Sequence, residues 1–130
     1  IPVKGMISDS EPVIEQLKRF GKDDSVKAIV LRIESPGGGV GPSQEIYEEV
    51  RKVAAKKPVL TSMGALTASG GYYIACATQK VFANPGTMTG SIGVPARTMA
   101  SVLPATTRQL LGRPRASEMT WIGSLTQNSR

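Results

Sequence analysis

The feature that most constrains this fold is an apolar run that leads into a glycine-rich segment. Residues 26–33, Val-Lys-Ala-Ile-Val-Leu-Arg-Ile, are nearly continuously apolar and rich in β-branched side chains. Such a run is typical of a strand buried on both faces of a parallel sheet. Residues 35–39, Ser-Pro-Gly-Gly-Gly, follow closely, and we expect a loop there. Together they predict an α/β protein with functional loops at the carboxyl ends of parallel strands.

The flanking sequence alternates between strand and helix patterns. The expected elements are a strand over residues 1–7, a helix ending at Gly21, the strand over 26–33, a helix with Ile46, Val50, Val53 and Ala54 on its inner face, a strand over 58–63, a turn over 64–68, a helix over 69–77 and a strand over 80–83. This βαβαβαβ order predicts repeated β-α units joined by right-handed crossovers, with a mostly parallel sheet.

Composition excludes several classes of function. The chain of 130 residues fits one compact domain. It contains no histidine, which removes the usual base of a catalytic triad and the commonest metal ligand, and Cys76 is its only cysteine. We therefore expect no disulfide framework, no metal site and no cofactor.

The net charge of +6 is concentrated late in the chain. Residues 95–130 contribute +4, from five arginines and one glutamate, and residues 1–94 contribute +2. Clusters of basic residues with stacking aromatics are not visible, so we expect no nucleic-acid partner. No run approaches the ~18 apolar residues of a membrane span, so we expect no span in this chain.

A second glycine-bearing segment carries a serine. Residues 64–73, Gly-Ala-Leu-Thr-Ala-Ser-Gly-Gly-Tyr-Tyr, also follow an expected strand and open a helix. A helix N-terminus favours the negative charge of an attacking alkoxide, although Ser69 alone is better explained as a helix cap. Backbone N–H groups of residues 35–39 can stabilise an oxyanion, although a flexible turn explains those glycines too. The two segments at neighbouring strand ends together favour acyl transfer.

Four motifs, in order, resemble the signal peptide peptidase A family of serine peptidases, which have the Clp protease/crotonase fold. They are Ser-Pro-Gly-Gly-Gly at 35–39, Ser-Met-Gly at 62–64, Ala-Ser-Gly-Gly-Tyr-Tyr-Ile-Ala at 68–75 and Asn-Pro-Gly-Thr-Met-Thr-Gly-Ser-Ile-Gly-Val at 84–94. The resemblance implies a peptidase core over residues 1–94.

The same resemblance implies roles for individual residues. Ser69 is the expected acylated nucleophile, and the N–H groups of Gly38 and Gly70 are the expected oxyanion hole. Ser91 matches a serine that holds a catalytic lysine beside the nucleophile in the family. The candidates for a peptide groove are Gly37, Gly39 and Tyr72.

The lysine base of the family has no counterpart at the expected place. A lysine can accept the serine proton when burial lowers its pKa. Here the corresponding neighbourhood is residues 120–123, Thr-Trp-Ile-Gly, and no lysine follows Lys80. Lys80 corresponds to a surface strand position close after Ser69, which disfavours it as the base. The general base is therefore unidentified.

Beyond Val94 the sequence changes character. Residues 95–130 contain five arginines, no lysine and nine serines or threonines, and prolines interrupt any helical period. We expect a divergent tail without a regular pattern of elements. The abrupt change at Pro95 suggests that residues 95–130 come from a shifted reading frame or replace the family's usual sequence. Translation of the coding DNA in the other two frames tests this hypothesis.

Three side chains outside the motifs' chemistry also carry expectations. Cys76 is expected to be a packed core thiol and Met63 a core residue. Tyr73, like Tyr72, is expected either to line a peptide groove or to pack between subunits.

Three functions are compatible with these residues. The first is a Ser/Lys endopeptidase that cleaves extended peptides such as remnant signal peptides. The second is a catalytically incomplete scaffold or peptide-binding domain of the same fold. The third, a crotonase-like acyl-CoA enzyme, is disfavoured by the Ala-Ser-Gly-Gly motif. The family resemblance also implies a homo-oligomeric ring at a bacterial or archaeal cell membrane, with the catalytic domain outside the cytoplasm or facing the membrane.

Overall fold

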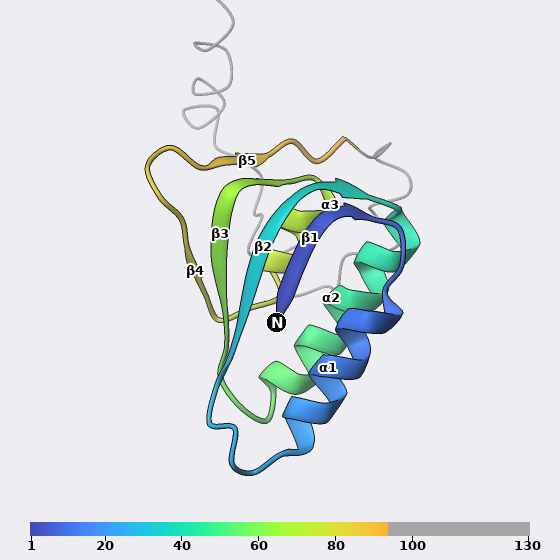
Figure 1. The fold of residues 1–130 in the computed structure, drawn as a ribbon, viewed down its shortest axis with the longest axis vertical. Coiled ribbons are helices and arrows are strands. Elements are labelled where there is room, and N and C mark those ends of the chain that lie inside the picture. Colours follow the sequence, from blue (N-terminus) through green and yellow to red (C-terminus); the bar gives the residue numbers. More distant parts are fainter. Residues whose placement is uncertain (94–130) are drawn as a thin grey trace, which may run out of the picture. The chain divides into compact units, whose positions relative to one another are not determined.

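The computed structural model describes residues 1–93, and the expected tail over residues 95–130 lies outside them. The elements in chain order are β1 (Pro2–Ile7), α1 (Glu11–Lys22), β2 (Ile29–Gly38), α2 (Val40–Ala54), β3 (Val59–Ala68), α3 (Gly70–Ala75), β4 (Lys80–Phe82) and β5 (Met88–Gly90), as Figure 1 shows. All strand pairs among these residues are parallel, in the order β1-β2-β3-β4, with β5 also paired to β3. This confirms the predicted α/β class with a parallel sheet.

The core of residues 1–93 lies between one face of the sheet and the helices. On β2, Ile29, Leu31 and Ile33 are buried, and they join Leu17 of α1 and Ile46 of α2 in one apolar cluster. Burying apolar side chains of this size supplies most of the free energy of folding. The intervening β2 side chains point the other way, and Val30 is 48% exposed. The expectation that this strand is buried on both faces is therefore wrong for the described residues, because their helices cover only one face.

Residues 35–38 are not a loop, because β2 continues to Gly38. Gly37 and Gly38 pair with Met6 and Ile7 at the end of β1. Gly37 has a φ of +102°, which a residue with a side chain rarely adopts, and a side chain at Gly38 would overlap the backbone of Ile7. The glycines therefore serve close strand contact rather than a turn, which is why local sequence preference misplaced them.

The expected turn over residues 64–68 is also strand. The first half of β3 pairs with β4, where Leu60 lies opposite Lys80. Its second half pairs with β5, where Ala68 lies opposite Gly90. β5 was not among the expected elements, and its residues lie within the motif over residues 84–94. A partner strand distant in sequence thus extends β3 past its glycine.

Three boundaries differ in smaller ways from those expected. β2 begins at Ile29, because the Val26 N–H donates to the Asp23 carbonyl in a preceding turn (3.0 Å). α1 continues through Gly21 to Lys22, and Gly21 packs against Val53 of α2. α3 ends at Ala75. In addition, no helix within residues 1–93 has the length and apolar character that a membrane crossing requires.

Candidate active site

Ser69 occupies a strained turn between β3 and α3. Its backbone has φ 51° and ψ −119°, and Ser91, with φ 54°, is the other non-glycine residue with positive φ in the described part of the chain. Such a conformation costs about 1–3 kcal/mol and persists only where its surroundings enforce it. The Ser69 N–H donates to the Gly90 carbonyl (2.8 Å), and the Tyr73 N–H donates to the Ser69 carbonyl (2.9 Å). A sharp strand-to-helix turn of this kind presents a serine hydroxyl to substrate.

The glycine-rich end of β2 lies directly against this turn. A Cβ added to Gly37 would stand 2.7 Å from the Ser69 Cβ and 2.9 Å from the Gly70 nitrogen. A Cβ added to Gly70 would stand 3.6 Å from the Gly38 nitrogen. The structure therefore brings Ser69 together with both residues expected to form the oxyanion hole.

Ser91 reaches the same end of the sheet through β5. Gly90, the last residue of β5, pairs with Ala68 and accepts the Ser69 N–H, so Ser91 follows directly after the residue that anchors the nucleophile turn. Ser91 itself is exposed. Residues from three separate motifs thus meet at one strand end.

Two of the expected groove residues flank this centre. Gly39 is exposed at the N-terminus of α2, where its N–H donates to the Ile7 carbonyl (2.8 Å). Tyr72 is half-buried on α3, and the neighbouring Cys76 thiol and then burial raise the pKa of its hydroxyl. Both therefore remain accessible in part, as a groove lining requires.

Cys76 is exposed at the end of α3, so the expectation of a packed core thiol is wrong. The helix α3 ends at Ala75, and Cys76 lies just beyond it with its side chain exposed. The core positions at this end of the helix are occupied by Ile74 and Ala75. Partial desolvation still raises the pKa of the thiol, against a smaller lowering by the Tyr72 hydroxyl. Met63, in contrast, is confirmed as a core residue.

Tyr73 is half-buried on α3 and packs against α2. Its ring stacks on Tyr47 of α2 with centroids 4.4 Å apart and planes inclined by 17°. Burial raises the pKa of its hydroxyl to about 12, with smaller contributions from Tyr47, Glu48 and Cys76. The buried hydroxyl has no hydrogen-bond partner among the described residues. Tyr73 thus fastens α3 to α2 behind the nucleophile.

Buried hydroxyls near the site escaped the sequence interpretation. Ser35 donates to the Gly5 carbonyl (2.6 Å) and accepts the Gly37 N–H (3.0 Å), which fixes the positive φ at Gly37. Ser43 donates to the Gly39 carbonyl (2.8 Å) and lies against Gly70. The sequence offered one indication of these roles, since Ser35 precedes the glycine segment and Ser43 follows it.

Lys80 lies at the wrong end of β3 to serve Ser69. It pairs with Leu60, whereas the serine turn begins after Ala68. A strand rises about 3.3 Å per residue, so the interval from Leu60 to Ala68 places Lys80 roughly 25 Å from the serine turn. A lysine side chain cannot span that distance. Residues 1–93 also contain no group of three His, Cys, Asp or Glu side chains placed to share a metal ion.

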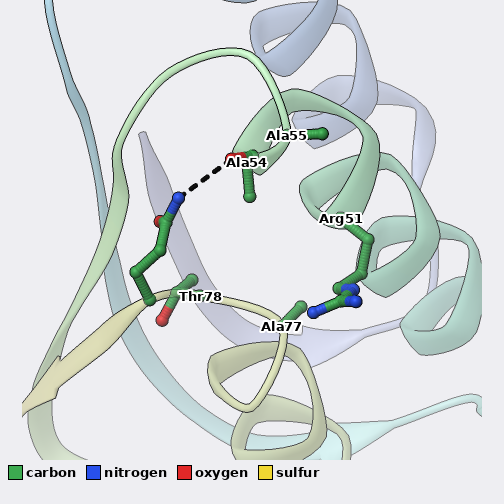
Figure 2. A pocket seen from close by; sticks show the side chains of 6 residues that line it. Arg51, Ala54, Ala55, Ala77 and Thr78 are labelled. Carbon is green, nitrogen blue, oxygen red and sulfur yellow. Dashed lines mark hydrogen bonds between the residues drawn. The ribbon is translucent and has the colours of Figure 1, made fainter. Parts of the chain in front are cut away.

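A hollow of about 200 Å³ lies away from Ser69, between the C-terminal ends of α2 and α3 (Figure 2). Gln79 crosses it, because its amide nitrogen donates to the Ala54 carbonyl (2.9 Å) and its amide oxygen accepts the Val59 N–H (2.7 Å). Arg51 lines the same hollow from α2. Gln79 therefore acts as a structural bridge between α2 and β3, and none of the expected site residues lines this hollow.

Comparisons with known proteins agree on one family. Residues 51–102 match the model of peptidase family S49. The chain is 49% identical over 80 residues to Protease 4 of Salmonella typhi, covering 61% of this chain and 13% of that protein. It is 44% identical over 82 residues to the putative signal peptide peptidase SppA of Enterococcus faecium, covering 62% and 24%. It is 40% identical over 98 residues to the chloroplastic serine protease SPPA of Arabidopsis thaliana, covering 71% and 14%.

Solved structures extend the comparison to the fold. ClpP1 from Listeria monocytogenes matches with a TM-score of 0.62 at 24% identity, covering 85% of this chain and 64% of that chain. A mutant of the membrane-bound stomatin-specific protease 1510-N matches with a TM-score of 0.61 at 24% identity, covering 77% and 56%. The chain spans only 13–24% of the length of the three relatives matched by sequence.

Proposed function

Because the chain belongs to peptidase family S49, we propose that its core, residues 1–94, carries the nucleophile of a serine endopeptidase of the signal peptide peptidase type. The observation that carries the proposal is the strained turn at Ser69, packed against the glycine end of β2 and tied to Gly90. A strained serine costs free energy, and presenting its hydroxyl to a substrate carbonyl is a function that offsets this cost.

In the proposed reaction, the Ser69 Oγ attacks the carbonyl carbon of a scissile peptide bond while a base takes its proton. The negative charge that develops on the carbonyl oxygen is stabilised by the N–H groups of Gly38 and Gly70, each worth about 3–4 kcal/mol of barrier. Collapse of the tetrahedral intermediate expels the amine, which takes the proton from the base. Water then attacks the acyl-enzyme, releasing a carboxylic acid and restoring Ser69.

We assign Ser91 to the base side of this site. In the proposed arrangement its hydroxyl holds the amine of a neutral lysine beside Ser69, and burial lowers the pKa of that lysine so that it can accept a proton. The position of Ser91, directly after the residue that accepts the Ser69 N–H, supports this role. Since Lys80 is too distant and no lysine follows it, the proposed source of the lysine is a different, lysine-bearing chain in the same ring, because an identical copy would lack the same lysine.

The proposed substrates are extended peptides such as remnant signal peptides. Two relatives are named as a signal peptide peptidase and a chloroplastic serine protease, and a structural neighbour is named as membrane-bound. We propose a membrane-associated setting for this chain by the same reasoning. Of the groove candidates, Gly39 and Tyr72 would contact the peptide backbone, because Gly39 is exposed and Tyr72 is half-buried. Gly37 is buried against the Ser69 turn and would shape the groove from beneath.

Labelling with a fluorophosphonate probe tests the nucleophile. The probe forms a bond between its phosphorus and the oxygen of an activated serine and loses fluoride. We expect the full chain to be labelled at Ser69 and the Ser69→Ala variant to remain unlabelled. Labelling of both proteins at equal rates, or of neither in the presence of a lysine-bearing relative, would count against the proposal.

The missing lysine favours a second candidate, a peptide-binding scaffold of the same fold. In that case an extended peptide binds beside Ser69 but is not cleaved. Calorimetric binding of such a peptide by a chain that no probe labels would support the scaffold, whereas cleavage of the peptide would exclude it.

A further inference from the structure

The register between β2 and β3 shifts shortly before Ser69. Ile33 pairs with Met63, and the next pair joins Ser35 to Thr67. Glu34 alone therefore faces the three residues 64–66, which we call the Gly64 bulge. Extra residues on one strand leave backbone groups without partners on the other, and they turn the strand.

Side chains, not backbone, satisfy the groups that the Gly64 bulge leaves unpaired. The Glu34 carboxylate accepts the N–H groups of Ala65 (3.0 Å) and Leu66 (3.2 Å). The Arg32 guanidinium donates to the Met63 carbonyl (2.8 Å), and the Thr87 hydroxyl donates to the Gly64 carbonyl (2.9 Å). The bond from Ala65 is exposed, whereas the bonds of Leu66, Met63 and Gly64 are part-buried. Part-buried backbone groups are expensive to leave unpaired, so these three bonds contribute most to holding the bulge in one form.

The glycine of the bulge is fitted to this carboxylate. A side chain at Gly64 would overlap the Glu34 carboxylate, because Oε2 and the carboxyl carbon lie too close to the place where a Cβ would stand. The position is buried and its φ is not in the left-handed region. Space for Glu34, rather than backbone freedom, therefore explains the glycine.

The bulge determines which residues of β3 reach the site. After it, Thr67 pairs with Ser35, Ala68 pairs with Gly90, and Gly90 then accepts the Ser69 N–H. A register change of one residue would exchange the two faces of the strand. It would move Ser69 and the adjoining Gly70 together out of register with Gly38 on β2.

We propose that Glu34 is a positioning residue for the nucleophile, whose carboxylate fixes the Gly64 bulge and so the register at which Ser69 leaves β3. This inference rests on the proposed role of Ser69. Glu34 is not a catalytic residue, because its oxygens bond the backbone of Ala65 and Leu66 and not the reacting groups.

The choice of variants follows from hydrogen-bond chemistry. An ionised carboxylate accepts at both oxygens, whereas glutamine offers one acceptor and an NH₂ group that opposes a backbone N–H. Glu34→Gln therefore keeps the shape and loses at least one bond. Thr87→Val removes the hydroxyl bonded to the Gly64 carbonyl and probes the same bulge without touching Glu34. Glu15→Gln, on the exposed side of α1, is the matched control for charge removal.

Two measurements on the full chain separate this inference from the proposed function. Amide hydrogen exchange at residues 65–69 reports the bulge without any catalysis, and fluorophosphonate labelling reports the nucleophile. Since a hydrogen bond to a charged group contributes about 1.5–3 kcal/mol, we expect Glu34→Gln to speed exchange at these amides about tenfold or more. We expect labelling of Ser69 to fall about tenfold, with only the modest fall in melting temperature that the loss of one hydrogen bond brings. Glu34→Asp, which keeps the carboxylate, should recover part of the exchange protection and of the labelling.

Unchanged exchange and labelling in Glu34→Gln would overturn the inference. A loss of melting temperature that spreads faster exchange over the whole chain would also overturn it, because that result describes a general stability role. If Glu34→Gln does not fold, Thr87→Val decides, with faster exchange confined to residues 64–69 as the supporting result. A wild-type chain that is never labelled contradicts the proposed function, and the exchange measurement still decides the role of Glu34.

Discussion

Ser69 and Ser91 both hold backbone conformations that usually belong to glycine. They lie at neighbouring ends of β3 and β5, and the bond from the Ser69 N–H to the Gly90 carbonyl joins the two strained turns. Backbone strain at two neighbouring serines points to a functional site more strongly than strain at either serine alone. In each case a serine stands where a glycine would fold at lower cost, and this strain is what supports the proposed roles of the two hydroxyls.

Gly37 gives the first prediction at this scale. Gly37→Ala introduces a methyl group 2.7 Å from the Ser69 Cβ at a φ of +102°, so we expect it to lower the free energy of unfolding by about 2–3 kcal/mol and to abolish labelling of Ser69. Urea denaturation and probe labelling measure the two effects.

Gly41 is the matched control for that substitution. It lies in α2 with nothing within 4 Å of an added Cβ and without a positive φ. Because alanine is the better helix former, Gly41→Ala should raise the free energy of unfolding by up to about 1 kcal/mol and leave labelling unchanged. Equal effects of the two substitutions would show that crowding at Ser69 is not what Gly37 prevents.

At the scale of elements, the sequence predicted which segments alternate but not how long the strands are. The apolar core of β2 and the helices α1 and α2 follow from local periodicity, and they were found close to their true places. The C-terminal parts of β2 and β3 contain serine, proline and glycine, which local preference assigns to turns. They are strands because β1 and β5 pair with them, and no local pattern records a partner distant in sequence.

The candidate site, too, divides into residues that the sequence motifs identify and residues that only the structure reveals. The four motifs located Ser69, Gly38, Gly70 and Ser91 without knowledge of the fold, and the structure brings these residues to one strand end. Hydroxyls and carboxylates that hold the backbone in place, such as Ser35 and Glu34, escaped notice. Their partners are main-chain groups, which every residue carries, so no pattern of residue types identifies them.

The contact between α2 and α3 gives a prediction that depends on pH. Burial raises the pKa of Tyr73 to about 12, so the folded protein favours the neutral phenol more than the unfolded chain does. This stability is fully present below the pKa of an unfolded tyrosine, near 10, and is lost as pH rises toward the folded value.

The variant Tyr73→Phe isolates that effect. At neutral pH it should be as stable as wild type or slightly more so, because the buried hydroxyl lacks a partner among the described residues. Above pH ~10 the wild type should lose stability relative to the variant. Parallel urea titrations across this range measure the difference, and curves of identical shape would exclude ionisation of Tyr73 as its cause.

At the scale of the whole molecule, the described core brings the proposed nucleophile and the two proposed oxyanion donors together, and the chain has no lysine beyond Lys80. A site complete except for its base should respond to a base added from solution. We expect neutral imidazole to increase the rate of fluorophosphonate labelling at Ser69 in proportion to its concentration.

The controls for this rescue are the Ser69→Ala chain and imidazolium at lower pH. Neither should show an increase, because one lacks the nucleophile and the other cannot accept a proton. A rate that is independent of imidazole, in a chain that is labelled without it, would mean that a base is already present within the molecule.

The glycines around Ser69 have a consequence for how this site changes over generations. Gly37, Gly38, Gly64 and Gly70 all lack room for a Cβ. Every amino-acid replacement from a single-base change in a glycine codon adds at least a methyl group, so mutation alone erodes this geometry quickly. A lineage released from selection would lose one of the four early. The packing around Ser69 would therefore persist only for as long as these four positions remain under selection.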